Sequence, residues 1–148
     1  MKFRFVDRIL SWTPHQRITG LKAVSFEEYC LKEPLGDEGR LPETLLLESL
    51  LQLGNWLILL STDFKQMGLV VRMSEVRFHD PLLPSQTLQM EVTLARQRED
   101  GFELSGEGRA NGRAIITGVE CLAVPVPAVE YVNPDDLRVV FSEIFLPP

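Results

Sequence analysis

The mainly apolar stretch of residues 41–63 carries four polar side chains at regular spacing, and these are the first candidates for chemistry. Thr44, Glu48, Gln52 and Asn55 occur at i, i+4, i+8 and i+11, so they share one face of a helix. An ionised carboxylate among Leu, Ile and Trp side chains is costly unless it is paired or used in function. Glu48 is therefore either a structural carboxylate or the centre of a functional site. A structural carboxylate would be satisfied by partners or would lie at a solvent-exposed edge.

The other reactive residue types form no recognisable site. His15 falls in the turn Thr13-Pro-His-Gln16, where we expect a solvated loop histidine. Cys30 and Cys121 are isolated in the sequence, which predicts reduced, largely buried thiols of a cytoplasmic protein. The chain contains no GxGxxG, Walker A or HExxH sequence, so we expect no metal and no resident cofactor.

The element that carries Glu48 is predicted to be a buried central helix. Pro42 suits a first helical turn, and Glu43 favours the positive end of the helix dipole. Residues 45–60 are mostly good helix formers, and their apolar side chains cover nearly the whole circumference. The polar residues in mid-segment, and an apolar core that is short for a span, argue against a membrane helix.

Strand patterns flank this helix on both sides. Before it, residues 3–9 predict a strand or an extended arm, residues 17–24 predict a strand with a bulge at Gly20, and residues 25–29 predict a short helical turn. After it, four strands are predicted at residues 68–77, 88–95, 102–109 and 114–124, with a tight turn at Asn111-Gly112. Two strands, one long helix and an antiparallel meander make an α+β domain, in which the sheet must curve strongly to enclose the helix.

The C-terminal tail differs in kind from the rest. Asn133-Pro134 provides an N-cap and a first-turn proline, and residues 137–145 place apolar side chains at i, i+3, i+4, i+7 and i+8. We therefore divide the chain into a domain, residues 1–126, and an extension with a short amphipathic helix, residues 127–148. The apolar face of that helix packs either on the domain itself or on a partner such as a second subunit.

Bulk properties exclude several classes of protein. A chain of 148 residues with 45% hydrophobic residues is enough for one domain with one core. A net charge of -6 and the absence of a basic run argue against nucleic-acid binding. Charged residues interrupt the N-terminal apolar positions, so no signal peptide is expected.

Three motifs then occur in an order that resembles one known family. They are Phe5-Val-Asp-Arg-Ile-Leu10, Leu41-Pro-Glu-Thr-Leu-Leu-Leu-Glu-Ser-Leu-Leu-Gln52 and Val76-Arg-Phe-His-Asp-Pro-Leu-Leu-Pro84. They are similar to the opening strand, the helix entry and the Lys-Phe-Arg-x-Pro-Val-x-Pro segment of the β-hydroxyacyl-[acyl-carrier-protein] dehydratases of fatty-acid synthesis. The resemblance covers roughly residues 3–124. It implies the hotdog fold, a curved antiparallel sheet wrapped around one central helix.

The resemblance also implies a substrate and an assembly. The substrate would be a 3-hydroxyacyl thioester of phosphopantetheine, presented as acyl-carrier protein or acyl-CoA, so the pantetheine arrives with the substrate and no separate cofactor is needed. Glu48 aligns with the helix carboxylate that assists departure of the hydroxyl. The substrate would lie along Pro34, Glu43, Thr44 and Gln52, near backbone N–H groups that polarise the thioester. The family forms dimers through a shared sheet, which implies a homodimer or higher assembly.

The chain departs from the family pattern at the histidine that removes the C2 proton. That position aligns with Pro34. His79 lies after the helix and is not expected at the site, whereas Glu33 or Asp37 could serve as a base if burial raised its pKa. Three hypotheses follow: a dehydratase-like hydro-lyase with a substitute base, a hotdog thioesterase that uses Glu48 alone, or a non-enzymatic acyl- or carrier-binding protein, including the inactive subunit of a heterodimer.

Overall fold

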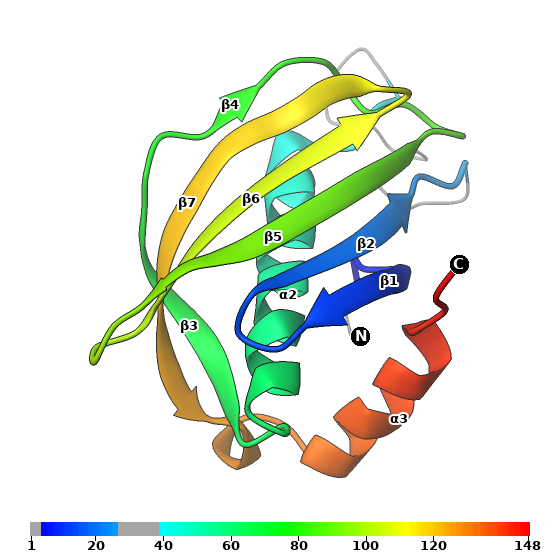
Figure 1. Ribbon diagram of the computed structural model, residues 1–148. Coiled ribbons are helices and arrows are strands. Elements are labelled where there is room, and N and C mark those ends of the chain that lie inside the picture. The colour runs from blue at the N-terminus through cyan, green and yellow to red at the C-terminus, as the bar shows by residue number, and fades with distance from the viewer. Residues whose placement is uncertain (1–3, 27–38) are drawn as a thin grey trace.

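A computed structural model describes residues 4–26 and 39–148, and shows one helix wrapped by one curved sheet (Figure 1). The sheet order is β1-β2-β5-β6-β7-β3, and all neighbours are antiparallel. A short β4 pairs with β7 at Ile116 and Thr117, a different part of β7 from the part that pairs with β3. The strands are β1 Arg8–Thr13, β2 Arg17–Ala23, β3 Gln66–Met73, β4 Arg77–Phe78, β5 Thr87–Gln97, β6 Phe102–Ala110 and β7 Arg113–Pro127. This is the expected α+β hotdog architecture.

The central helix, α2, runs from Glu43 to Ser61 through the concave side of the sheet (Figure 1). Its buried side chains meet those of β2, β5, β6 and β7 in one core, to which Leu46, Leu50, Leu53 and Leu57 contribute almost fully buried side chains. Within the described residues, α2 alone is long and apolar enough to cross a membrane. Half of its most apolar window is buried inside this fold, as expected of a core helix.

Several details of the sheet differ from the sequence prediction. The first strand, expected at residues 3–9, is instead β1 at Arg8–Thr13, and residues 4–7 form no strand. The strand expected at residues 68–77 is divided, because β3 ends at Met73 and β4 begins at Arg77. The predicted meander holds for β5, β6 and β7, whereas β3 pairs with β7 rather than with β5. Sequence alternation reports which residues face the core, but it carries no information on which strand is the neighbour.

Gly20 marks a close approach between the sheet and the helix. The register shift of the β1–β2 pair lies in β1, between Ile9 and Ser11, and not in β2 where the sequence placed it. A Cβ at Gly20 would lie 2.8 Å from the Arg8 carbonyl oxygen and 2.9 Å from Leu53 Cδ1. The glycine therefore allows α2 to pack directly on β2. In the β6–β7 turn, Asn111 and Gly112 both have positive φ, at 50° and 75°, as predicted for a tight hairpin.

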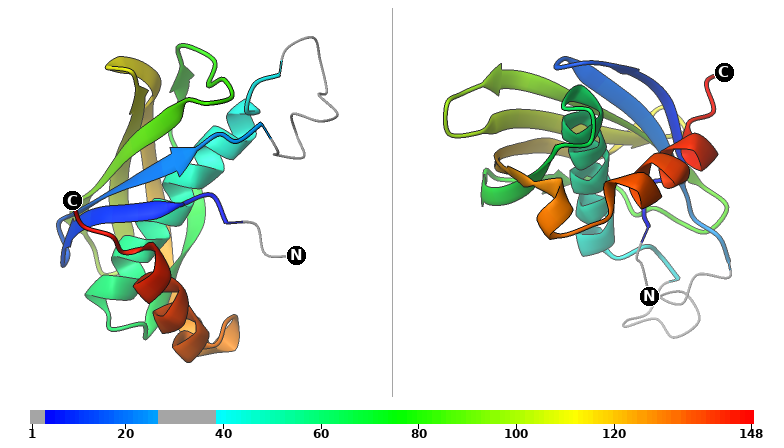
Figure 2. Two further views of the ribbon diagram at one scale, coloured as in Figure 1. Left: turned by 90° about the vertical axis from the view of Figure 1, so that its right-hand side faces the viewer. Right: turned by 90° about the horizontal axis from the view of Figure 1, so that it is seen from below.

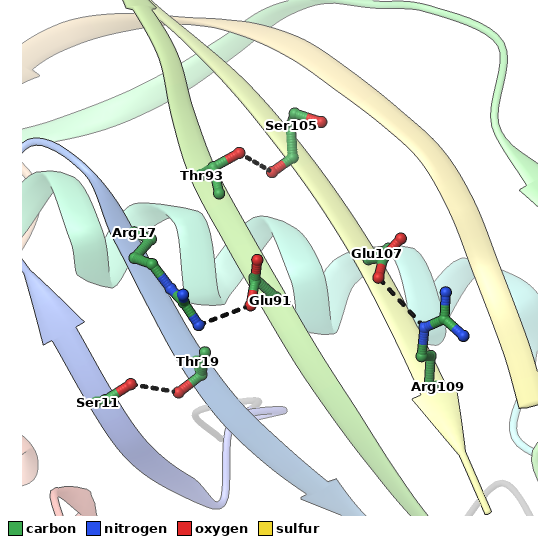
Figure 3. Close-up of polar contacts among 8 residues, drawn as sticks. All are labelled: Ser11, Arg17, Thr19, Glu91, Thr93, Ser105, Glu107 and Arg109. Atoms are coloured by element: carbon green, nitrogen blue, oxygen red, sulfur yellow. Dashed lines mark hydrogen bonds and ion pairs between the residues drawn. The ribbon is translucent and has the colours of Figure 1, made fainter. Parts of the chain in front are cut away.

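Polar contacts cover the side of the sheet that faces away from α2 (Figure 3). Arg17 pairs with Glu91 at 2.8 Å across β2 and β5, and Ser11 and Thr19 share a hydrogen bond of 2.7 Å across β1 and β2. Glu107 and Arg109 form an ion pair along β6. These exposed groups belong to the solvent face, so the core lies on the opposite, helix-facing side.

The C-terminal helix, α3, spans Pro134–Ile144 after a short 3-10 helix, η1, at Ala128–Glu130. The Asn133 side chain accepts a hydrogen bond from the Asp135 amide, so the predicted N-cap is confirmed. α3 lies beside the C-terminal half of α2 and next to β1 (Figure 2). Its Phe141 ring contacts the rings of Trp12, Trp56, Phe64 and Phe145. The apolar face of the tail thus packs on the domain itself.

Candidate functional site

One stripe along α2 is left partly open by the sheet. It consists of half-buried or exposed residues at helical spacing, whereas the sheet-facing residues of α2 are buried. The stripe contains Thr44, Leu47, Glu48, Leu51, Gln52 and Asn55. The four polar residues expected on one face are therefore brought together. Leu47 and Leu51, which the polar pattern did not select, give the same stripe an apolar lining.

Glu48 is half-buried and is held by its neighbour one turn further along the helix. Gln52 Nε2 donates to Glu48 Oε1 over 2.9 Å, and Gln52 Oε1 accepts from the Phe5 backbone amide over 2.8 Å. Because a backbone N–H can only donate, the orientation of the Gln52 amide is fixed. Glu48 Oε1 is consequently an acceptor, and a proton on this carboxyl group would reside on Oε2.

Asn55 has a structural task at the end of the same stripe. Its Oδ1 accepts a hydrogen bond of 2.8 Å from the Gly68 amide, which joins α2 to β3. A Cβ at Gly68 would lie 2.5 Å from Ile58 Cδ1, so the glycine lets the strand approach the helix. Asn55 thus secures the sheet against α2, and Glu48 with Gln52 remains as the polar pair for function.

The N-terminal end of α2 presents the other predicted substrate-binding residues. Pro42 is the N-cap and provides no capping side chain, while Glu43 and Thr44 in the first turn are exposed. Helix amides without a capping side chain remain able to bind an oxygen of a ligand. A hydrogen bond of 2.9 Å from the Leu41 amide to the Leu82 carbonyl oxygen fixes this end of the helix against the loop before β5.

The described histidines are engaged elsewhere. His15 donates its backbone N–H to Ser61 Oγ at the far end of α2, and thirteen residues of helix correspond to roughly 20 Å from Glu48. The exposed His79 ring is hydrogen-bonded through Nε2 to Thr117 Oγ1 on β7 at 2.6 Å. Pro34, Glu33 and Asp37, together with Cys30 and most of the turn predicted at residues 25–29, lie outside the described residues.

Two cavities adjoin the open stripe of α2. The first, between α2 and the sheet, measures about 20 Å³, and small residues line it, including Gly54, Gly68 and Gly106. That volume holds about one water molecule. The second measures about 210 Å³ and lies between α2 and α3, with Gln52 and Trp56 on one wall and Val140 on the other. The sequence identified the apolar face of α3, but not the space that this face encloses.

Comparison with known proteins gives one family and one fold. Residues 1–119 match the family model described as the FabA-like domain. The chain is 32% identical over 114 residues to the 3-hydroxyacyl-[acyl-carrier-protein] dehydratase FabZ of Oleidesulfovibrio alaskensis, a match that covers 75% of this chain and 74% of the relative.

Solved structures agree on the fold at low sequence identity. The smu.793 protein of Streptococcus mutans bound to acetyl CoA superposes with a TM-score of 0.64 and 7% identity, covering 81% of this chain and 88% of that one. The dehydratase heterocomplex ApeI:P of Xenorhabdus doucetiae gives a TM-score of 0.61 and 10% identity, covering 77% and 92%. At such identities, the likeness concerns the hotdog fold alone.

Proposed function

The chain belongs to the FabA-like domain family, and we propose that it binds acyl thioesters of phosphopantetheine and interconverts their 3-hydroxyacyl and trans-2-enoyl forms through Glu48. The observation that carries this proposal is the half-buried Glu48 carboxylate on the open stripe of α2, oriented by Gln52. No arginine or lysine in the described part of the chain forms an ion pair with Glu48. The carboxyl group is therefore available for proton transfer.

The chemistry follows from the orientation of that carboxyl group. In dehydration, a base takes the C2 proton, the released electron pair forms the C2–C3 double bond, and the C3–O bond breaks. The leaving hydroxyl receives the proton of Glu48 Oε2 and departs as water. The helix N-terminus at Pro42 and Glu43 would support the negative charge that develops on the thioester oxygen.

A base for the C2 proton is the second requirement. Glu33 and Asp37 in the segment before α2 are the candidates that the sequence offers in place of the family histidine. Glu33→Gln and Asp37→Asn each remove one of the two candidate bases, so the pair of variants distinguishes between them. The base is the residue whose replacement removes activity while acyl-chain binding persists.

A second candidate function is acyl-thioester binding without catalysis. Its support is the alignment of Pro34 with the family histidine, which the resemblance implies. In addition, His15 lies at the far end of α2 and the His79 ring is hydrogen-bonded to Thr117. In that case Glu48 and Gln52 would serve as polar scaffolding. Such a protein would bind an acyl carrier, or pair with an active subunit.

We further propose that the protein is a homodimer formed through β3. The other sheet edge, at β1, is covered by the C-terminal segment, since Ile9 and Phe145 form a parallel bridge. Among the strands that the structure describes, β3 pairs with β7 on one side only, and its Leu69 and Val71 side chains are exposed by 54% and 56%. An open, apolar edge strand is a natural site for pairing with a second copy. The free, buried Cys121 fits a reducing compartment, so we propose the cytoplasm.

The deciding experiment offers the purified protein two substrates. A trans-2-enoyl pantetheine thioester reports hydration through loss of its enoyl absorbance, and a saturated acyl thioester reports hydrolysis through free thiol. Hydration that is lost in Glu48→Gln supports the proposed reaction. Thiol release without hydration would indicate a thioesterase. Neither reaction, with binding of the acyl chain intact, would support the non-catalytic alternative.

A further inference from the structure

The cavity between α2 and α3 has walls from three separate parts of the chain. α2 contributes Trp56 and Leu59, the N-terminal arm contributes Val6, and α3 contributes Leu137, Val140 and Ile144. The lining is mainly apolar, with Arg4 and Asp136 as its charged members. A largely apolar cavity with a few polar groups is the usual form of a site for a small, greasy ligand.

The cavity begins one helical turn away from the proposed reaction centre. Gln52 lines it, and the Nε2 atom of the same side chain donates to Glu48 Oε1 over 2.9 Å. We infer that this cavity receives the tail of the acyl chain, so that α3 acts as the end wall that sets acyl-chain length. This inference rests on the proposed function, because Glu48 fixes where the thioester end of the ligand lies.

The size of the cavity defines the class of ligand. Its volume is about 210 Å³. A cavity of about 150 Å³ accommodates benzene, so on the same scale this one holds roughly eight carbon atoms. A medium-length acyl chain fits that space. A long-chain acyl group would have to displace α3.

The end wall is firmly attached to the domain. Arg138 donates to Asp63 Oδ1 at 3.0 Å and lies over the Phe64 ring, with its guanidinium carbon 4.5 Å from the ring centroid. Phe141 packs between the two tryptophans, Trp12 and Trp56. α3 also lies beyond residues 1–119, the part matched by the family model. The end wall is thus formed by residues outside the matched region.

Neighbouring residues of α3 provide a matched pair of variants. Val140 lines the cavity, whereas Val139 is 58% exposed on the outer side of the same helix. Val140→Trp fills the cavity, and Val139→Trp adds the same bulk to the surface. Thermal unfolding and near-ultraviolet circular dichroism verify that both variants keep the fold. The probes are S-alkyl pantetheine thioethers with chains of four, six, eight and ten carbons, which cannot be hydrolysed.

The expected result is a chain-length effect confined to one variant. The affinity of the wild type, measured by calorimetry, should rise by up to about fourfold for each methylene added until the cavity is full. Val140→Trp should lose this gain, with at least tenfold weaker binding of the eight-carbon probe, and Val139→Trp should retain it. Equal profiles for the two variants, or a wild-type affinity that does not rise with chain length, would overturn the inference.

Hydration of matching enoyl thioesters separates this inference from the proposed function. If the wild type hydrates them and Val140→Trp leaves its chain-length preference unchanged, the cavity assignment fails and the reaction stands. If no hydration occurs but Val140→Trp removes chain-length-dependent binding, the cavity assignment stands and the reaction fails.

Discussion

Gln52 donates a hydrogen bond of 2.9 Å to Glu48 and in turn accepts one of 2.8 Å from the Phe5 amide. The N-terminal arm therefore determines which way the glutamine amide points, and the amide determines which carboxylate oxygen accepts. A side chain that is oriented from both ends contributes a preorganised group to a site. This relationship makes the role of Glu48 testable through its neighbour as well as by direct substitution.

Replacing Glu48 by Gln should abolish hydration of trans-2-enoyl thioesters. The amide keeps the shape and polarity of the carboxyl group but cannot transfer the proton, and such groups contribute about 10²–10⁴-fold to rate. Steady-state kinetics measure the loss, and thermal unfolding verifies the fold. Glu99→Gln, an exposed change in the β5–β6 turn, is the control for loss of one negative charge. Equal rates for wild type and Glu48→Gln would rule out Glu48 as the acid.

Replacing Gln52 by Glu should move the pH profile of the reaction. The variant would replace the N–H that holds Glu48 Oε1 with a second carboxylate, and two like charges in contact repel each other. We expect the kcat/KM profile, measured from pH 5 to 9, to differ in shape from that of the wild type. Gln66→Glu, at the start of β3, adds the same charge away from this pair. An unchanged profile in Gln52→Glu would separate Gln52 from the chemistry.

Replacing Gly20 by Ala should destabilise the fold by about 1–3 kcal/mol. The new Cβ would meet the Arg8 carbonyl oxygen at 2.8 Å and Leu53 Cδ1 at 2.9 Å, so β1, β2 or α2 must shift. Urea unfolding followed by circular dichroism measures the loss. Gly39→Ala is the matched control, since no atom lies within 4 Å of its added Cβ. Equal unfolding free energies for the two variants would contradict the close packing of α2 on β2.

Substituting Val71 on β3 should change the oligomeric state. The side chain is 56% exposed on the open edge strand, so Val71→Lys would place a charge in the proposed interface. Sedimentation velocity should show a dimer for the wild type and a monomer for the variant. Val139→Lys places the same charge on an exposed part of α3 and should remain dimeric. A monomeric wild type would remove the dimer proposal.

Cys121 should be unreactive in the folded protein. Burial raises the pKa of its thiol, so the neutral, less nucleophilic form dominates at neutral pH. In a Cys30→Ser background, alkylation by iodoacetamide should be much slower in buffer than in urea. The thiol pKa is higher in the folded protein than in the unfolded protein, so the protonated thiol favours the folded state. Its contribution to the free energy of unfolding is fully present below the unfolded pKa, about 8.5, and declines as the pH rises above that value. Cys121→Ala should remove that decline.

The sequence was sufficient for the elements that have strong local signals. The mostly apolar, helix-forming residues 45–60 predicted the helix, Asn111-Gly112 predicted the hairpin, and Asn133-Pro134 predicted the start of α3. It was insufficient for the position of β3, because pairing with β7 is a long-range choice between strands of similar composition. The break between Met73 and Arg77 also lacks a proline or glycine that would have marked it.

The candidate site was predicted only in part. Helical spacing alone brought Glu48 and Gln52 together, and the structure gives them a direct hydrogen bond. The anchor on the Phe5 backbone could not be found, since a backbone amide carries no residue-type signal. The cavity between α2 and α3 was also missed. An amphipathic pattern shows that one face of a helix is covered, but not how completely the neighbouring side chains fill the space next to it.

The C-terminal cover on β1 has a consequence for refolding kinetics. Leu146 donates its amide to the Ile9 carbonyl oxygen, and Arg8 donates to the Leu146 carbonyl oxygen from 138 positions away in the chain. Contacts so distant in sequence form slowly. Protein diluted from denaturant should therefore pass through a state with β1 unshielded, and concentrated samples should aggregate during that interval.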